Sequence, residues 1–204
     1  MELEMKYAIP DKETADAIWN DPTIQQLADP SSAEKVVMKA VYFDTPDGKL
    51  SKNNMAVRVR YEGDSVFATL KWNGSAVNGF HEREEINVPC GEEYFISSPK
   101  ELFRESEDGK VLIDLIGDEP LINLLEMRFL RRRIRLQYGA SIMEMAIDSG
   151  AIITDNGEVP IMEMEIELYA GDPSDIQQLA EGLADAYGLV PENRSKLVRG
   201  LAIL

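Results

Sequence analysis

The chain has 204 residues, 44% of them hydrophobic, and carries 21 lysines and arginines against 37 aspartates and glutamates, a formal charge of −16. Enough apolar side chains are present to form a globular core, which excludes a disordered acidic protein, while the negative charge argues against nucleic acid or an anionic membrane as a partner. A single cysteine and a single histidine exclude a disulfide framework and metal centres rich in those residues, so carboxylates are the abundant metal ligands and favour Mg²⁺, Mn²⁺ or Ca²⁺.

Strand-like segments, separated by Gly, Pro, Asn and Asp, dominate the chain. We expect strands near residues 2–9, 35–44, 54–61, 65–73, 80–88, 127–138, 141–148 and 161–169. Tight turns are predicted at residues 45–48, 62–64, 73–74 and 138–140. Helical periodicity covers residues 12–27 and residues 173–187, with Gly188 at the C-cap of the second helix, and one or two looser helices are expected within residues 99–125.

The chain reads as one unit without a membrane segment. No Pro-rich linker, low-complexity run or internal repeat interrupts it, so a single domain over residues 1–204 is expected. No apolar run is long enough to cross a bilayer, and the N-terminus opens with Glu2 and Glu4 rather than with the basic and apolar regions of a signal peptide. We therefore expect a cytoplasmic protein.

The polar face of several predicted strands carries an unusual density of full charges. The carboxylates on these faces are Glu2, Glu4, Glu144, Asp148, Glu163, Glu165 and Glu167, and the cations are Lys6, Arg58, Arg60, Lys71, Arg131, Arg133 and Arg135. In an open sheet these faces would be solvated, and each cross-strand pair would contribute about 0.2–1 kcal/mol. In a closed barrel with the charges inward, they would line a wet tunnel suited to a polyanion with divalent metal.

Two runs of like charge favour the tunnel. Glutamates alternate along residues 163–167 and arginines along residues 131–135, and like charges two residues apart repel each other. A bound metal would offset the repulsion in the acidic run, and phosphate oxygens would offset it in the basic run. Acidic runs also occur on solvated strands, so the pattern by itself leaves the open sheet as an alternative.

A series of short motifs follows the predicted strands in a fixed order. They are ExExK at Glu2–Lys6, YFDTP at Tyr42–Pro46, AVRVR at Ala56–Arg60, TLK at Thr69–Lys71, HEREE at His81–Glu85, AIDSG at Ala146–Gly150, MEMEIEL at Met162–Leu168 and SKLVRG at Ser195–Gly200. In this order they resemble the motifs of the CYTH, or triphosphate tunnel metalloenzyme, superfamily. Each motif alone is common, but the ordered set is specific and spans essentially the whole chain.

The resemblance implies a fold of the α+β class, an eight-stranded antiparallel β-barrel with peripheral helices. The barrel of this superfamily is a tunnel for a triphosphate-containing small molecule with Mg²⁺ or Mn²⁺. Residues 69–88 and 163–172, with Ser195 and Lys196, resemble most the bacterial inorganic triphosphatases. Larger members of that branch continue into a helical polyphosphate-binding CHAD domain, and this chain is expected to be the stand-alone form.

The resemblance also implies roles for individual residues. Metal ligands are expected at Glu2, Glu4, Asp148, Glu163 and Glu165. Substrate-binding cations are expected at Lys6, Arg58, Arg60, Lys71, Arg83, Arg131, Arg133 and Lys196. Catalytic roles are expected for Glu2, Glu4, Asp148 and Lys196. Arg132 is expected to point outward, and the sequence leaves open whether Glu167, Arg135 and Arg199 belong to the site.

Three residues with reactive side chains are not assigned to the chemistry. His81 is the only histidine and has no paired nucleophile, so a packing or surface role is favoured. Cys90 has no catalytic partner pattern. Ser195 has no visible base and is expected to be a helix N-cap.

The implied activity is metal-dependent hydrolysis of inorganic triphosphate to pyrophosphate and phosphate by a metal-activated water molecule. A class IV adenylate cyclase and a thiamine triphosphatase are the alternatives within the same fold. The first would have to hold a base, and the second would need an aromatic site, to which the sequence does not assign Trp72 or Phe80. A non-catalytic polyphosphate or nucleotide-binding module, or an acidic β-barrel interaction protein without a phosphate ligand, are alternatives of another class.

Overall fold

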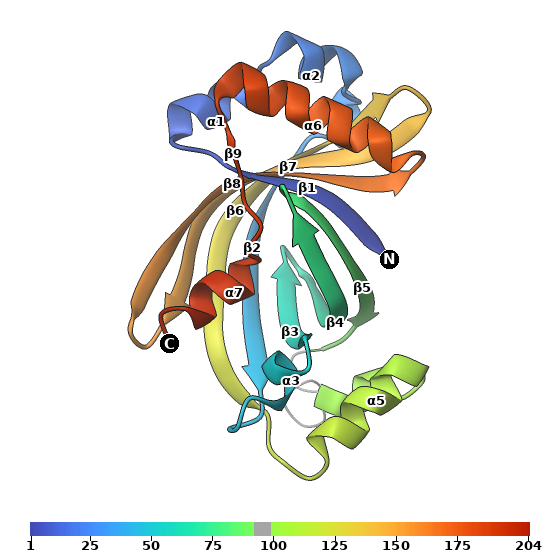
Figure 1. Ribbon diagram of the computed structural model, residues 1–204, viewed down its shortest axis with the longest axis vertical. Coiled ribbons are helices and arrows are strands. Elements are labelled where there is room, and N and C mark those ends of the chain that lie inside the picture. The colour runs from blue at the N-terminus through green and yellow to red at the C-terminus, as the bar shows by residue number, and fades with distance from the viewer. Residues whose placement is uncertain (92–98) are drawn as a thin grey trace.

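The computed structural model describes residues 1–91 and 99–204, and its strands form one sheet that closes into a barrel (Figure 1). The main strands are β1 (Glu2–Ala8), β2 (Glu34–Asp44), β3 (Met55–Glu62), β4 (Ser65–Val77), β5 (Phe80–Pro89), β6 (Ile122–Tyr138), β7 (Ser141–Thr154) and β8 (Gly157–Ala170), and the two-residue β9 (Val190–Pro191) pairs with β1. The helices are α1 (Lys12–Trp19), α2 (Pro22–Leu27), α3 (Lys49–Lys52), α5 (Glu107–Ile116), α6 (Pro173–Tyr187) and α7 (Lys196–Leu201), with 3₁₀ turns at Pro30–Ser32 and Pro99–Phe103. None of the described helices is long and apolar enough to span a membrane.

The barrel is closed by a pairing between β1 and β5. Neighbouring strands are antiparallel in the order β5-β4-β3-β2-β6-β7-β8-β1, and β1 then pairs back with β5, with Glu2 opposite Arg83. On the other side of β1, Glu4 lies opposite Glu167 of β8. The structure thus confirms the eight-stranded antiparallel barrel and excludes the open sheet. Closure brings the inward charges of all eight strands into one enclosed space.

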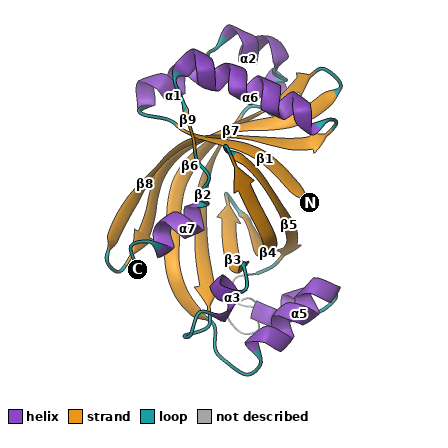
Figure 2. Cartoon of the chain, in the orientation of Figure 1, coloured by secondary structure: helices purple, strands orange, loops and turns teal. Residues whose placement is uncertain are grey.

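Apolar side chains on the outside of the barrel pack against helices, which leaves the inside to the charges. Helices α1, α2 and α6 cover one end of the barrel, and α3 and α5 lie at the other (Figure 2). Ile134 and Leu136 of β6 share one buried core with α6, whereas Val57 of β3 shares another with Leu112 of α5. Because side chains alternate along a strand, these outward residues force their neighbours inward.

Helix α7 lies apart from the other helices, across one side of the barrel (Figure 1). The hydroxyl of Ser195 accepts a hydrogen bond from the backbone N–H of Val198 at 3.2 Å, which confirms the predicted N-cap. Leu197 packs against a core that includes Leu125 and Ile152. Helix α7 therefore covers part of the outer surface of the barrel.

Two local predictions are wrong. Asn73 and Gly74 do not form a turn, because β4 continues through them with a register shift, and Asn73 takes the left-handed φ of 53°. The turn is formed by Asn78 and Gly79, with φ values of 52° and 80°. The predicted helix over 12–27 is two helices, since Asp21 caps a new helix that begins at Pro22.

The strand pairs β6–β7 and β7–β8 are also longer than predicted. Strand β6 begins at residue 122, inside the segment expected to be helical, and β7 and β8 extend to residues 154 and 157. The Ser149-Gly150 pair resembles a turn in sequence, but in the structure Gly150 lies within β7, opposite Phe129. The glycine is needed there because the backbone of β6 approaches very closely.

Replacing Gly150 by alanine is expected to lower the free energy of unfolding by about 3 kcal/mol. A Cβ atom at this position would lie 2.1 Å from the carbonyl oxygen of Arg128 and 2.5 Å from the Cα atom of Phe129, and backbone atoms cannot move aside cheaply. Urea unfolding measures the change. The matched control is Gly182→Ala in α6, where a Cβ has no neighbour within 4 Å and should stabilise by about 0.5–1 kcal/mol. Equal stability of both variants would contradict the expected close approach.

Candidate active site

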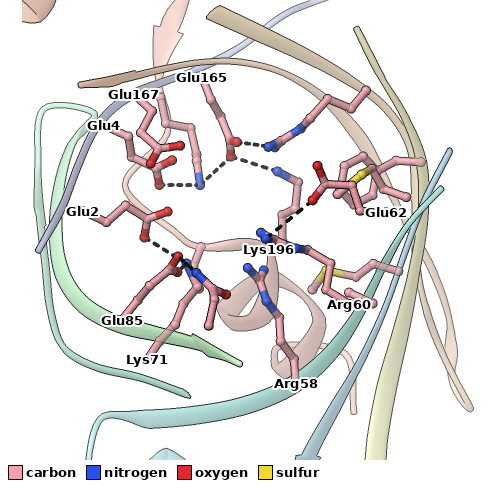
Figure 3. Close-up of a pocket in the computed structure, with 18 of the residues that line it drawn as sticks. Glu2, Glu4, Arg58, Arg60, Glu62, Lys71, Glu85, Glu165, Glu167 and Lys196 are labelled. Carbon is pink, nitrogen blue, oxygen red and sulfur yellow. Dashed lines mark hydrogen bonds and ion pairs between the residues drawn. The ribbon is translucent and has the colours of Figure 1, made fainter. Parts of the chain in front are cut away.

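The barrel interior holds a cavity of about 250 Å³ whose wall is dominated by charged side chains (Figure 3). Nine of its described lining residues are cations and seven are carboxylates. The cations are Lys6, Lys39, Arg58, Arg60, Lys71, Arg83, Arg131, Arg133 and Lys196, and the carboxylates are Glu2, Glu4, Glu62, Glu85, Glu144, Glu165 and Glu167. In a chain with a formal charge of −16, this wall has an excess of positive charge. The cavity therefore favours an anionic ligand.

One side of the wall is formed by ion pairs between β1, β4 and β5. Glu2 accepts hydrogen bonds from Lys71 Nζ at 2.8 Å and from Arg83 Nε at 2.5 Å. Arg83 also contacts Glu4, and Lys71 contacts Glu85. Burial alone would raise the pKa of Glu2, but Lys71 and Arg83 lower it well below its usual range. Glu2 is therefore a carboxylate at neutral pH.

Helix α7 places Lys196 among three buried carboxylates from β7 and β8. Lys196 Nζ lies 2.7 Å from Asp148 Oδ2 and 2.9 Å from Glu165 Oε1, and it also contacts Glu163. Arg131 forms a bidentate pair with Asp148, at 2.8 and 2.7 Å, and its Nη2 lies 2.5 Å from Glu165. One oxygen from each of the three carboxylates lies within 4.8 Å of the others. This buried acidic cluster can bind a metal ion through oxygen ligands, the type that Mg²⁺ and Mn²⁺ prefer.

Two arginines of β3 keep unused hydrogen-bond donors. Arg58 Nη1 donates to the hydroxyl of Tyr42 at 3.1 Å, and no carboxylate among the described residues forms an ion pair with Arg58. Arg60 Nη2 lies 3.6 Å from Glu62. The Nε atoms of both arginines are buried and have no hydrogen-bond partner among the described residues. Buried donors of this kind are normally satisfied, so these arginines fit the oxygens of a bound phosphate group.

Four glutamates gather on the side of the cavity opposite Arg58 and Arg60 (Figure 3). Three of them, Glu2, Glu4 and Glu85, form ion pairs with a lysine or an arginine. The fourth, Glu167, forms no such pair with the described residues. Burial and the charges of these three neighbours raise the pKa of Glu167 to about 8. A divalent cation would remove this repulsion, so the group is suited to a metal as well. Glu167, for which the sequence left a mouth residue and a metal ligand as alternatives, lines the cavity.

Glu167 is expected to make a contribution to the free energy of unfolding of the metal-free protein that decreases as the pH rises. Its pKa is about 8 in the folded state against 4.5 unperturbed, so the folded state holds this proton more tightly. The stabilisation is complete below the unperturbed pKa and is lost as the pH rises through the folded pKa. Melting temperatures in EDTA between about pH 5 and 9 should therefore decline less for Glu167→Gln than for the wild type. Glu158→Gln, an exposed change on the same strand, should leave the decline unaltered; identical slopes for all three proteins would refute the assignment.

Of the thirteen residues predicted for the site, eleven line the cavity. Asp148 and Glu163 lie behind the wall, where both contact Lys196. The five predicted metal ligands thus form two groups, with Glu2 and Glu4 on β1 and the other three around Lys196. Arg132 points outward as expected, with its Nη1 2.7 Å from Asp16 of α1.

Several lining residues were not assigned from the sequence. They are Lys39, Tyr42, Glu62, Glu85, Asn87, Glu144 and Tyr169. The sequence pattern could have predicted two of them. Glu85 follows Arg83 by two residues and so shares its strand face, and Glu144 belongs to one of the charged strand faces. His81 lies outside the charged cavity and its Nε2 is 2.7 Å from the carbonyl oxygen of Glu192, in agreement with a packing role.

A second cavity of about 340 Å³ adjoins the charged one, beside α7. It shares four lining residues with the first, namely Tyr42, Lys71, Arg83 and Ser195. Its other walls are less polar and include Met55, Trp72 and Leu197, with the amides of Asn54 and Asn193. Phe80 packs instead against the core beneath α6.

The charged barrel and the order of the motifs agree with a match to a known protein family. Residues 1–201 match the CYTH domain family. The chain belongs to the CYTH family. Over 160 residues it is 32% identical to the inorganic triphosphatase of Haemophilus influenzae, a match that covers 78% of this chain and 44% of that protein. This CYTH chain therefore spans less than half the length of the curated relative.

Solved structures share the CYTH fold over nearly the whole chain. A Hippeastrum protein, described as an adenylyl cyclase candidate with a dominant triphosphatase activity, has a TM-score of 0.68 at 18% identity and covers 99% of this chain and 96% of its own. An adenylate cyclase-like protein from Bacillus halodurans has a TM-score of 0.63 at 20% identity, covering 98% and 96%. At these identities the likeness establishes the fold.

Proposed function

We propose that this CYTH protein hydrolyses inorganic triphosphate to pyrophosphate and phosphate, with Mg²⁺ or Mn²⁺. The observation that carries the proposal is the excess of cations on the cavity wall of a strongly acidic chain, with Arg58 and Arg60 holding unused donors. A chain of phosphate groups is the anion that matches several cations spread along one tunnel. The similarity to the Haemophilus inorganic triphosphatase supports the same activity.

The substrate phosphates would be held by cations from several strands. The proposed set is Lys6, Arg58, Arg60, Lys71, Arg83, Arg131, Arg133 and Lys196. Arginine presents a planar fork that matches two phosphate oxygens, whereas lysine acts as a point charge. Lys196 is the one of these that belongs to α7, and we propose that it contacts the reacting phosphate.

The metal would be held by carboxylates in the cavity wall and directly behind it. The proposed ligands are Glu2, Glu4, Asp148, Glu163 and Glu165, and the position of Glu167 beside Glu2 and Glu4 adds this residue to them. The ligand atoms of these residues are all carboxylate oxygens, which fits a hard divalent ion. When bound, the ion would supply an activated water molecule for attack on the terminal phosphorus.

The protein residues have complementary parts in the proposed reaction. The arginines and lysines orient the triphosphate in line with the attacking water and stabilise the charge that develops on the departing pyrophosphate. The acidic side, at Glu2, Glu4 and Glu167, faces the basic side across the cavity, so that metal and phosphate would meet between them (Figure 3). A covalent intermediate with the protein is not required.

Phosphate release tests the proposal directly. The purified protein would be incubated with tripolyphosphate, ATP or thiamine triphosphate, each with Mg²⁺, Mn²⁺ or EDTA. Metal-dependent release that is fastest from tripolyphosphate is the expected result. Absence of release from all three, together with a higher melting temperature in tripolyphosphate, would show a binding module instead.

The second cavity favours one alternative, the use of an organic triphosphate. Trp72 offers a ring, and Asn54 and Asn193 offer amide groups, next to the phosphate-binding cations Lys71 and Arg83. A thiamine or adenine group attached to the phosphates could enter this space. Faster release from ATP or thiamine triphosphate, or formation of cyclic AMP from ATP, would identify this activity.

We also infer a cytoplasmic location and one domain over residues 1–204. The family match over residues 1–201 supports the single domain. Neither nucleic acid nor a membrane is proposed as a partner, because the basic residues of the cavity face inward. Fractionation of the producing cells would test the location.

A further inference from the structure

Arg199 of α7 follows Lys196 by three residues but does not line the charged cavity. Its Nη1 donates to Glu163 Oε2 at 2.5 Å, and its Nη2 donates to the carbonyl oxygen of Pro160. The side chain of Arg199 is 11% exposed, so solvent screens this ion pair only weakly. Arg199 thus ties α7 to β8, the strand that carries Glu163.

Glu163 bridges Arg199 and Lys196. One carboxylate oxygen contacts Lys196 Nζ and the other contacts Arg199, while the side chain itself is 1% exposed. A buried carboxylate needs its charge compensated and its oxygens paired. Arg199 satisfies the oxygen that Lys196 does not reach.

The charge of the cluster around Lys196 depends on Arg199. Asp148, Glu163 and Glu165 carry three negative charges, and Arg131, Lys196 and Arg199 lie against them. A fourth cation, Lys6, lies 3.0 Å from Glu165 and is shared with Glu4. Removal of the guanidinium would leave Lys196 as the one cation in an ion pair with Glu163 among the described residues. The less compensated charge of Glu163 would weaken the attraction for a triphosphate and hold Lys196, which already contacts Glu163, more firmly on the side away from the cavity.

Helix α7 packs tightly against the barrel, and a small shift of the helix would move Lys196. A Cβ atom on Gly200 would lie 2.5 Å from Leu125 Cδ2 and 2.9 Å from Ile152 Cγ2, and both side chains are buried. The helix is held on this side by packing and on the Glu163 side by Arg199. Two anchors therefore determine where the ammonium group of Lys196 lies.

We propose that Arg199 is a positioning residue that acts through Glu163 and sets the affinity of the tunnel for triphosphate by holding Lys196 at the cavity wall. The inference rests on the proposed function, because it assigns a consequence for triphosphate binding. Arg199 touches neither the cavity nor a substrate in it. Its loss should therefore change binding more than the chemical step.

The test compares initial rates of tripolyphosphate hydrolysis with Mn²⁺ for the wild type, Arg199→Gln, Arg199→Lys and Arg194→Gln. We expect Arg199→Gln to raise KM about tenfold and to change kcat less than about threefold. Arg199→Lys restores the positive charge and should return KM to within about threefold of the wild type. Arg194→Gln is the matched control, since Arg194 is 63% exposed and pairs with Glu192 outside the cavity.

Three results would overturn the positioning role. They are an unchanged KM in Arg199→Gln, a fall in kcat as large as the rise in KM, and an Arg199→Lys variant as impaired as Arg199→Gln. Melting curves establish which variants are folded, and Arg199→Lys keeps the test open if Arg199→Gln does not fold. If the wild type shows no turnover, the proposed function fails, and stabilisation by tripolyphosphate in wild type and variant then tests the positioning role alone. A wild type that is neither active nor stabilised refutes both.

Discussion

Replacing Glu4 by glutamine is expected to reduce metal-dependent tripolyphosphate hydrolysis by about a hundredfold or more. The Glu4 side chain lines the cavity and is only 4% exposed, and it lies 3.3 Å from Lys6 Nζ. Glutamine keeps the shape but removes the negative charge that a divalent ion requires and that Lys6 and Arg83 now share. The loss should appear in kcat/KM measured at low Mg²⁺ or Mn²⁺, below saturation of the wild type.

A matched change on the outside of the barrel separates this effect from general damage. Glu158→Gln alters an exposed carboxylate of β8 and should leave the rate unchanged. Partial recovery of Glu4→Gln at higher metal concentration would agree with a role in metal binding. A Glu4→Gln variant within about threefold of the wild type at low metal would remove Glu4 from the proposed ligands.

Replacing Asp148 by asparagine is expected to lower the free energy of unfolding by about 3–5 kcal/mol. Asp148 is fully buried and pairs with Arg131 through both oxygens and with Lys196 through one. Asparagine is nearly the same size but removes the negative charge that balances the buried Arg131 and Lys196. Leaving buried cations unbalanced costs more free energy than the ion pair itself contributes. Urea unfolding at neutral pH gives the change.

The double variant Asp148→Asn with Lys196→Met tests the cause. Removal of one of the two buried cations should make the double variant more stable than the sum of the single losses predicts. The exposed control Asp155→Asn, in the turn between β7 and β8, should change stability by less than about 0.5 kcal/mol. A loss below about 1 kcal/mol for Asp148→Asn would show that the carboxylate is not needed to balance Arg131 and Lys196.

The strands and their charged faces were predictable because alternation is a local property. A strand with Val57 and Val59 against a helix must place Arg58 and Arg60 on the other face, whatever the rest of the fold. The order of the motifs identified the barrel, and the barrel placed eleven predicted residues in the cavity. The outward direction of Arg132 followed from the same rule.

Predictions failed where a local signal had two structural outcomes. Asn-Gly at residues 73–74 and at 78–79 reads equally as a turn, yet the first is a bulge within β4 because β5 pairs on both sides of it. Gly150 resembles a loop residue, but the backbone of β6 is what requires a glycine there. In both cases the neighbouring strand decides the outcome.

The sequence by itself determined the strand faces, the excess of carboxylates over the whole chain and most of the charged residues that line the cavity. Only the tertiary structure decided which of these residues meet. Glu167 joins Glu2 and Glu4 because β8 and β5 both flank β1, and Lys196 enters the acidic cluster because α7 packs across the barrel. The physical reason is that side-chain direction follows from the local backbone, whereas partners far apart in the chain depend on register and closure.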